Sequence, residues 1–164
     1  MTDASLQSLI DRAELSDLVY RYAQAIDRRD WALLRQCFTP EIEADFRSFG
    51  VREVFRGPAD DWVALVRSTI EGCDSTQHQS SNHRFEVDGE RAQGSSYIRA
   101  EHVVINDRGD NYYTVAGYYA HDFLRTPEGW RTAKYTLHVT SSFGNRHVLA
   151  LATRRAARRA EDRS

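Results

Sequence analysis

The chain has 164 residues, of which 41% are hydrophobic, so it is long and apolar enough to fold as one domain around a buried core. Its formal net charge of -2 at pH 7 argues against a general nucleic-acid-binding protein, which would need a basic face. The sequence has neither a signal-peptide pattern nor an apolar run of membrane-spanning length, so we expect a cytoplasmic protein without membrane partners.

The first part of the chain is predicted to be helical. Apolar residues recur at helical spacing over residues 15–26, and Asp11 is placed to cap the start of this helix. A second, short helix is expected between Asp30, its cap, and Pro40, which would stop it. A third helix is predicted to begin at Pro58, and its apolar face contains Trp62, Leu65, Val66 and Ile70.

After Gly72 the pattern changes to β-type runs that are separated by the turn signals "DGE", "DRGDN" and "TPEG". Helices followed by an antiparallel meander predict an α+β fold in which the helices cover one face of a curved sheet. We assign residues 1–150 to this domain. Residues 151–164 form a basic tail, interpreted as an exposed helical end without a core-forming stripe, and a functional basic arm stays open as the alternative.

Two of the predicted strands place small and aromatic residues on one face. Alternation puts a first set together on the second strand: Ala92, Gly94, Ser96, Ile98, Ala100 and His102. It puts a second set together on the third strand: Tyr113, Val115, Gly117, Tyr119, His121 and Phe123. These faces predict an apolar cavity with a few convergent polar groups, which is the usual form of a small-molecule site.

Histidines are the residues most able to carry chemistry here. We single out His78 and His102, leave His121 undecided, and interpret the others as structural: His83, His138 and His147. No close histidine pair and no cysteine spacing indicates a metal site, and neither a disulfide nor a zinc site is indicated. The glycines are scattered at turns rather than gathered in a phosphate-binding loop, so no cofactor is expected.

The stretch "RYAQAIDRRDWALLRQCFTPEIEADFRSF" resembles the opening of SnoaL-like proteins, which share the cone-shaped fold of nuclear transport factor 2. The chain is more closely similar to scytalone dehydratases, through Asp27 within "DRRDW", through "DFRSF", and through His78 within "TQH". His102 follows at nearly the interval of that family. The resemblance implies a cone-shaped α+β barrel, with N-terminal helices packed on a curved antiparallel sheet.

Two further likenesses and several departures accompany this resemblance. The helix-end aspartate with a strand histidine is similar to the catalytic pair of hexachlorocyclohexane dehydrochlorinases, and Tyr22 resembles a tyrosine of bile-acid dehydratases. Scytalone dehydratases have tyrosines where this chain has Ile26 and Phe46, and their strand serine and asparagine fall near Gly117 and Tyr119. The residues that would contact the substrate therefore differ from those of scytalone dehydratases, which argues against an identical substrate.

The resemblance and the chemistry of the residues imply a cofactor-independent lyase of the dehydratase type. Asp27 would orient His78, His78 would remove a carbon-bound proton, and His102 would polarise an oxygen. The substrate would be a small hydrophobic ring, polyketide or steroid-like compound, and its binding residues would be Tyr22, Phe46 and Tyr119.

Other interpretations remain open at this point. The same fold and proton relay suit an isomerase or a polyketide cyclase, and the fold also serves non-catalytic ligand-binding or assembly proteins. Asp27 could instead form a surface ion pair with its arginine neighbours, Arg28 and Arg29. The resemblance further implies a homo-oligomer, with a trimer favoured over a dimer.

Overall fold

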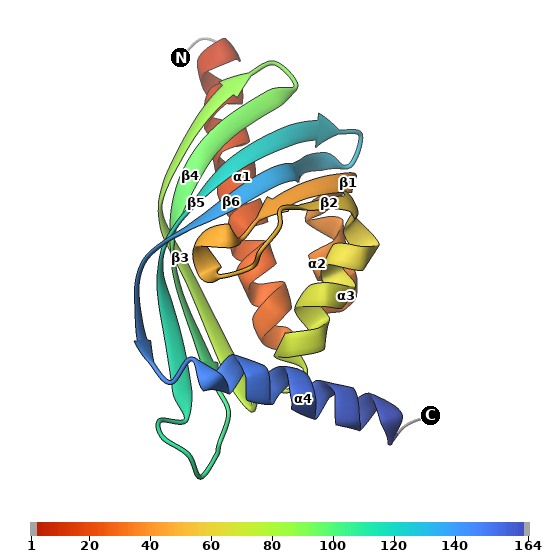
Figure 1. Ribbon diagram of the computed structural model, residues 1–164. Coiled ribbons are helices and arrows are strands. Elements are labelled where there is room, and N and C mark those ends of the chain that lie inside the picture. Colours follow the sequence, from red (N-terminus) through yellow and green to blue (C-terminus); the bar gives the residue numbers. More distant parts are fainter. Residues whose placement is uncertain (1–2, 163–164) are drawn as a thin grey trace.

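The computed structural model describes residues 3–162, in which helices surround the inner side of a curved sheet (Figure 1). The helical elements are α1 (Asp3–Arg28), α2 (Trp31–Gln36), a 3-10 turn η1 (Arg47–Phe49), α3 (Ala59–Ile70) and α4 (His147–Glu161). The strands are β1 (Phe38–Asp45), β2 (Phe55–Pro58), β3 (Ser75–Asp88), β4 (Arg91–Val103), β5 (Tyr112–Thr126) and β6 (Gly129–Gly144). Among these residues, no helix is long and apolar enough to cross a membrane.

The six strands form one sheet in the order β2-β1-β6-β5-β4-β3. The predicted meander from β3 to β6 is antiparallel throughout, whereas β1 pairs with β6 in parallel, so the sheet is mixed. Turn signals in the sequence predict only those strand pairs that a short hairpin joins. They could not predict the pairing of β1 with β6, because these strands lie far apart in the chain. The sheet is curved and open, with α1, α2 and α3 on its concave side, which confirms the predicted α+β architecture (Figure 1).

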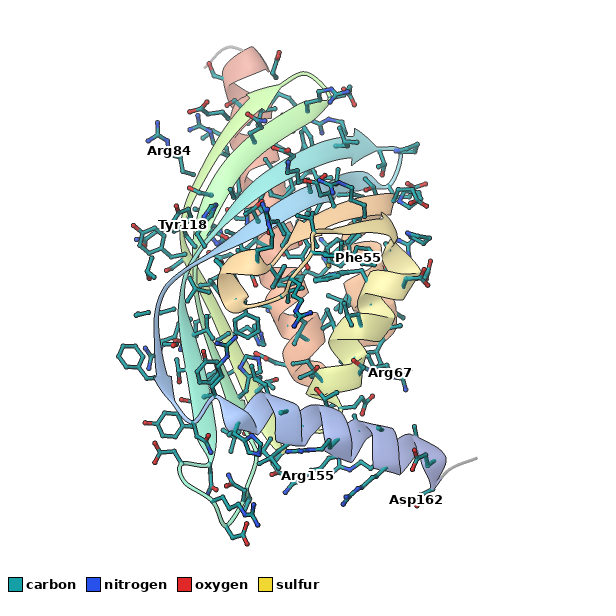
Figure 2. The ribbon with its side chains drawn as sticks, in the orientation of Figure 1. Phe55, Arg67, Arg84, Tyr118, Arg155 and Asp162 are labelled. Carbon is teal, nitrogen blue, oxygen red and sulfur yellow. The ribbon has the colours of Figure 1, made fainter. Side chains whose placement is uncertain are left out.

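The inner faces of β4 and β5 are those that the alternation predicts. The residues predicted to face inward are buried, as Ser96, His102, Tyr119 and Phe123 show. Tyr118, next to Tyr119 on β5, is exposed and stacks on His138. Figure 2 shows Tyr118 on the outer side of the sheet, and Phe55 on the inner side near α3. Two strands thus present their small and aromatic side chains toward the helices.

Helix α1 begins at least eight residues before the predicted start, so the capping role predicted for Asp11 is wrong. The Asp11 side chain is 5% exposed and its Oδ1 lies 2.6 Å from an Nη2 of Arg125 on β5. The guanidinium of Arg125 also lies over the ring of Trp130, at 4.2 Å from its centroid. A buried carboxylate needs a positively charged partner. A local sequence pattern could not predict this one, because Arg125 lies 114 residues from Asp11.

Helix α3 differs in one residue from its predicted apolar face. Trp62 and Ile70 are buried as predicted, but Leu65 is 52% exposed and Val63 is buried in its place. Leu65 nevertheless borders the large cavity between α3 and the sheet, so this face of α3 covers a cavity rather than a filled core.

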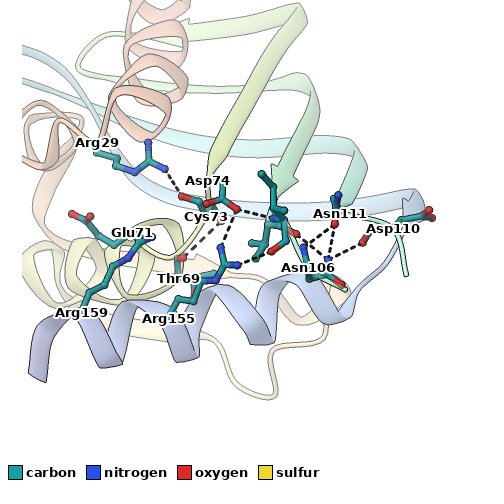
Figure 3. Close-up of polar contacts among 12 residues, drawn as sticks. Arg29, Thr69, Glu71, Cys73, Asp74, Asn106, Asp110, Asn111, Arg155 and Arg159 are labelled. Atoms are coloured by element: carbon teal, nitrogen blue, oxygen red, sulfur yellow. Dashed lines mark hydrogen bonds and ion pairs between the residues drawn. The ribbon is translucent and has the colours of Figure 1, made fainter. Parts of the chain in front are cut away.

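The segment predicted as an exposed helical end is helical, as the last part of α4, but the predicted exposure is wrong for its first turn. Ala152 in this segment and Val148 just before it are fully buried against the sheet and α3. Arg155 donates to the Asp74 carboxylate at 2.9 Å and to the Ile105 carbonyl at 2.6 Å (Figure 3). Small residues between the arginines carry a weak hydrophobic signal, so only the docked structure reveals that this helix is anchored.

Candidate active site

A cavity of about 610 Å³ lies between the concave face of the sheet, the end of α1 and helix α3. Its walls are mainly aliphatic and aromatic, a composition typical of sites for small apolar ligands. The lining residues whose side chains carry a polar or charged group are Tyr22, Glu53, Arg56, Trp62, Thr69, His78, His102 and Tyr119.

Asp27 lies in the last turn of α1 and binds the start of β3 through three contacts. Its Oδ1 lies 2.7 Å from Nδ1 of His78 and accepts a hydrogen bond from the Thr76 hydroxyl at 2.9 Å. Its Oδ2 accepts the backbone N–H of His78 at 2.7 Å. The partner of Asp27 is therefore His78 rather than a neighbouring arginine, and Arg29 donates instead to the Cys73 carbonyl.

These contacts decide the protonation of the pair. Burial raises the pKa of Asp27, but the hydrogen bonds and charge of His78 outweigh it, so the pKa lies below the ordinary value. An ionised carboxylate can only accept hydrogen bonds. The hydrogen of neutral His78 is therefore assigned to Nδ1, the ring nitrogen that faces Asp27. Its Nε2 then carries the free lone pair, and the side chain, which is 7% exposed, lines the cavity.

His102 stands beside His78 on the neighbouring strand. The backbone register pairs His102 with Thr76, and the two imidazole rings are nearly perpendicular with centroids 5.4 Å apart. Burial, together with the nearby His78, lowers the pKa of His102 to about 4. His102 is therefore a neutral imidazole at physiological pH, able to donate one hydrogen bond and accept another.

We expect the His102 ring to show no titration between about pH 5.5 and pH 8 when its ring-proton shifts are followed by NMR. The neutral form is retained until the pH falls toward the lowered pKa of about 4. The same protein unfolded in urea supplies the control, because its histidines should titrate near about pH 6.5. A His102 midpoint above pH 6 in the folded protein would contradict this burial argument.

The residues predicted to bind substrate also lie at the cavity. Tyr22, Phe46 and Tyr119 all line it, and the Phe46 ring centroid lies 6.1 Å from that of Tyr119. Burial raises the pKa of Tyr22 and of Tyr119 well above the ordinary value, so both phenols stay protonated. The structure thus brings all of these residues to one cavity, with Asp27 behind His78.

Residues that the sequence left undecided or did not select lie behind this wall. His121 is buried outside the cavity lining, and its Nε2 lies 2.9 Å from the Ser96 hydroxyl. Tyr135 of β6 is 2% exposed, and its hydroxyl accepts a hydrogen bond from Nε1 of Trp62. Strand alternation could have placed Tyr135 inward, but no local signal pairs it with a helix residue 73 positions away.

Comparisons with known proteins agree with this architecture. A family model described as the SnoaL-like domain matches residues 7–136. An uncharacterized protein of Mycobacterium tuberculosis is 29% identical over 127 residues, which cover 77% of this chain and 84% of that protein. The scytalone dehydratase of Colletotrichum orbiculare is 28% identical over 117 residues, covering 69% of this chain and 62% of the enzyme.

Solved structures show the same fold. A protein from Kribbella flavida superimposes with a TM-score of 0.83 at 28% identity, covering 87% of this chain and 99% of the other. A hexachlorocyclohexane dehydrochlorinase from Novosphingobium barchaimii superimposes with a TM-score of 0.70 at 18% identity, covering 87% and 94%. At that identity the second likeness concerns the fold alone.

Proposed function

The chain belongs to the SnoaL-like domain family, and we propose that it is a cofactor-independent lyase of the dehydratase type. The observation that carries this proposal is the 2.7 Å contact between Asp27 and His78 at the wall of an apolar cavity of about 610 Å³. The relationship to a scytalone dehydratase supports the same class of reaction. The substrate would be a small hydrophobic cyclic compound of the polyketide or steroid type.

In the proposed reaction, Nε2 of His78 accepts a proton from a carbon next to a carbonyl group. The electron pair of the broken C–H bond moves into the carbonyl to give an enolate, and Asp27 stabilises the resulting imidazolium. His102, with Tyr22 or Tyr119, donates hydrogen bonds to the carbonyl oxygen or to the departing hydroxyl. The enolate electrons then re-form the carbonyl and a new C=C bond, and the hydroxyl on the neighbouring carbon leaves as water with the proton that the His78 imidazolium returns.

The first half-reaction can be tested without the natural substrate. We expect the protein to accelerate hydrogen–deuterium exchange at the carbon between the ring and the carbonyl of 2-tetralone, a neutral bicyclic ketone. General base catalysis typically supplies about 10²–10⁴-fold, and NMR in deuterated buffer measures the rate directly. Exchange no faster than in buffer would contradict an acid–base role and favour a non-catalytic binding protein.

The matched control uses tetralin, the hydrocarbon with the same ring system. Tetralin has no carbonyl group and should occupy the apolar cavity without reacting, so saturating tetralin is expected to suppress the exchange. Exchange that persists under saturation would come from histidines elsewhere on the protein. An isomerase or cyclase would share the exchange step and differ only in the fate of the enolate.

The proposal includes assembly and location. We place the protein in the cytoplasm as a homo-oligomer, with a trimer favoured over a dimer by the likeness to scytalone dehydratases. Exposed aromatic residues on the outer side of the sheet suit such an interface, namely Tyr97, Tyr118 and Phe143.

A further inference from the structure

The backbone just after the end of α1 has a conformation that an arginine rarely adopts. Arg29 has φ +56°, in the left-handed region that disfavours residues with a Cβ. Its N–H donates to the Ile26 carbonyl at 3.1 Å, and the N–H of Asp30 donates to the Ala25 carbonyl at 2.9 Å. These two bonds define a Schellman motif, in which the left-handed residue is usually glycine. The chain therefore has an arginine where a glycine would be less strained.

The side chain of Arg29 connects this helix end to the start of β3. Its Nη2 donates to the Cys73 carbonyl at 2.8 Å (Figure 3). Cys73 lies in the short turn that joins α3 to β3, shortly before Thr76. Thr76 and His78 are the residues through which β3 contacts Asp27. Arg29 and Asp27 thus hold the start of the same strand at two separate points.

Helix α4 fixes the same turn from the other side. Arg155 donates to the Asp74 carboxylate at 2.9 Å, and Arg159 donates to the Glu71 carbonyl at 2.7 Å (Figure 3). Because α4 holds this turn in place, the hydrogen bond from Arg29 fixes the end of α1 relative to β3.

We propose that Arg29 is a positioning residue for the pair formed by Asp27 and His78. Its bond to the Cys73 carbonyl keeps the Asp27 carboxylate within 2.7 Å of Nδ1 of His78, a contact that weakens steeply once the two elements move apart. The same bond offsets the strain of the left-handed backbone. The effect on reaction rate rests on the proposed function, whereas the effect on the His78 tautomer requires no catalysis.

The test is Arg29→Gly, which removes the guanidinium and relieves the backbone strain. These changes oppose each other in stability, so we expect a urea midpoint close to that of the unmodified protein. The His78 hydrogen should no longer be confined to Nδ1, and a mixture with the Nε2–H tautomer is expected. Catalysed exchange of 2-tetralone should fall by about 10- to 100-fold, the effect of a small misplacement.

NMR of isotope-labelled imidazoles measures the tautomer at about pH 9, where histidines are ordinarily neutral. The spectrum of His78→Ala assigns the His78 signals. The matched control is Arg28→Ala, which removes an exposed positive charge directly next to Asp27 and should change neither the tautomer nor the rate. Arg29→Lys keeps a cationic donor and should retain most of both.

The tautomer decides the outcome. An unchanged His78 tautomer in Arg29→Gly would overturn the inference whatever the rate, and so would an equal change in Arg28→Ala, which would indicate an effect of charge alone. A tautomer change that accompanies a markedly lower urea midpoint would assign Arg29 a structural role instead. The two proposals fail separately, because the tautomer can be measured even if the unmodified protein catalyses no exchange, a result that would refute only the lyase.

Discussion

Replacing His78 by alanine is expected to lower the protein-catalysed exchange of 2-tetralone by about 10²–10⁴-fold, to the rate of buffer alone. His78 is the only imidazole among the described residues whose Nδ1 contacts a carboxylate within 4 Å while its ring lines the large cavity. Among the described residues that line the cavity, no other imidazole combines a free nitrogen lone pair with a carboxylate that would stabilise its protonated form. The rate by NMR checks the chemistry, and circular dichroism checks that the fold persists.

A companion substitution separates orientation from basicity. In Asp27→Asn, the amide oxygen must accept the His78 backbone N–H now bound by Oδ2, so the amide NH₂ faces Nδ1 of the imidazole. An NH₂ group can only donate there, which moves the imidazole proton to Nε2 and blocks the base. We expect a loss comparable to that of His78→Ala, since the wrong tautomer alone is highly damaging.

The control for both variants is His147→Ala, at the start of α4 and outside the cavity lining, which should exchange 2-tetralone at the normal rate. If His78→Ala kept the full rate while His147→Ala or another surface variant lost it, the base would lie elsewhere. A normal rate in Asp27→Asn alone would leave His78 as base and refute the orienting role of the carboxylate.

Replacing Gly72 by alanine is expected to detach α4 and to destabilise the protein by about 3 kcal/mol, the upper end of typical overpacking costs. A Cβ at this position would lie 1.8 Å from the carbonyl oxygen of Ala152 and 2.5 Å from its carbon. Both are backbone atoms of α4, so no side-chain rotation relieves the clash and the helix itself must move. Urea unfolding followed by circular dichroism measures the loss.

Proteolysis reports where the damage lies. Arg155 and Arg159, held by Asp74 and by the Glu71 carbonyl, should become cleavable by trypsin once α4 is released (Figure 3). Gly89→Asn is the matched control, because Gly89 has φ +57°, which asparagine tolerates, and open space around its Cβ position. Stability and cleavage of Gly72→Ala equal to those of the control would show that α4 is not packed as described.

The sequence by itself determined which side of β4, β5 and α3 faces inward. Strand alternation assigned Ser96, His102 and Tyr119 to the core side, and helical spacing assigned Trp62 and Ile70. These assignments succeed because the period of a strand or helix fixes the direction of a side chain from its immediate neighbours. The selection of Asp27 and His78 came from motif resemblance, since periodicity alone gives an aspartate at a helix end no partner.

Only the tertiary structure decided what the polar groups meet. Asp27 contacts a histidine 51 residues away, Asp11 an arginine 114 residues away, and Trp62 a tyrosine 73 residues away. The burial of α4 likewise depends on the absence of a side chain at Gly72. A buried polar atom must find its partner wherever the chain brings one within about 3 Å. That pairing depends on how curved strands and helices come together, and no local sequence period encodes it.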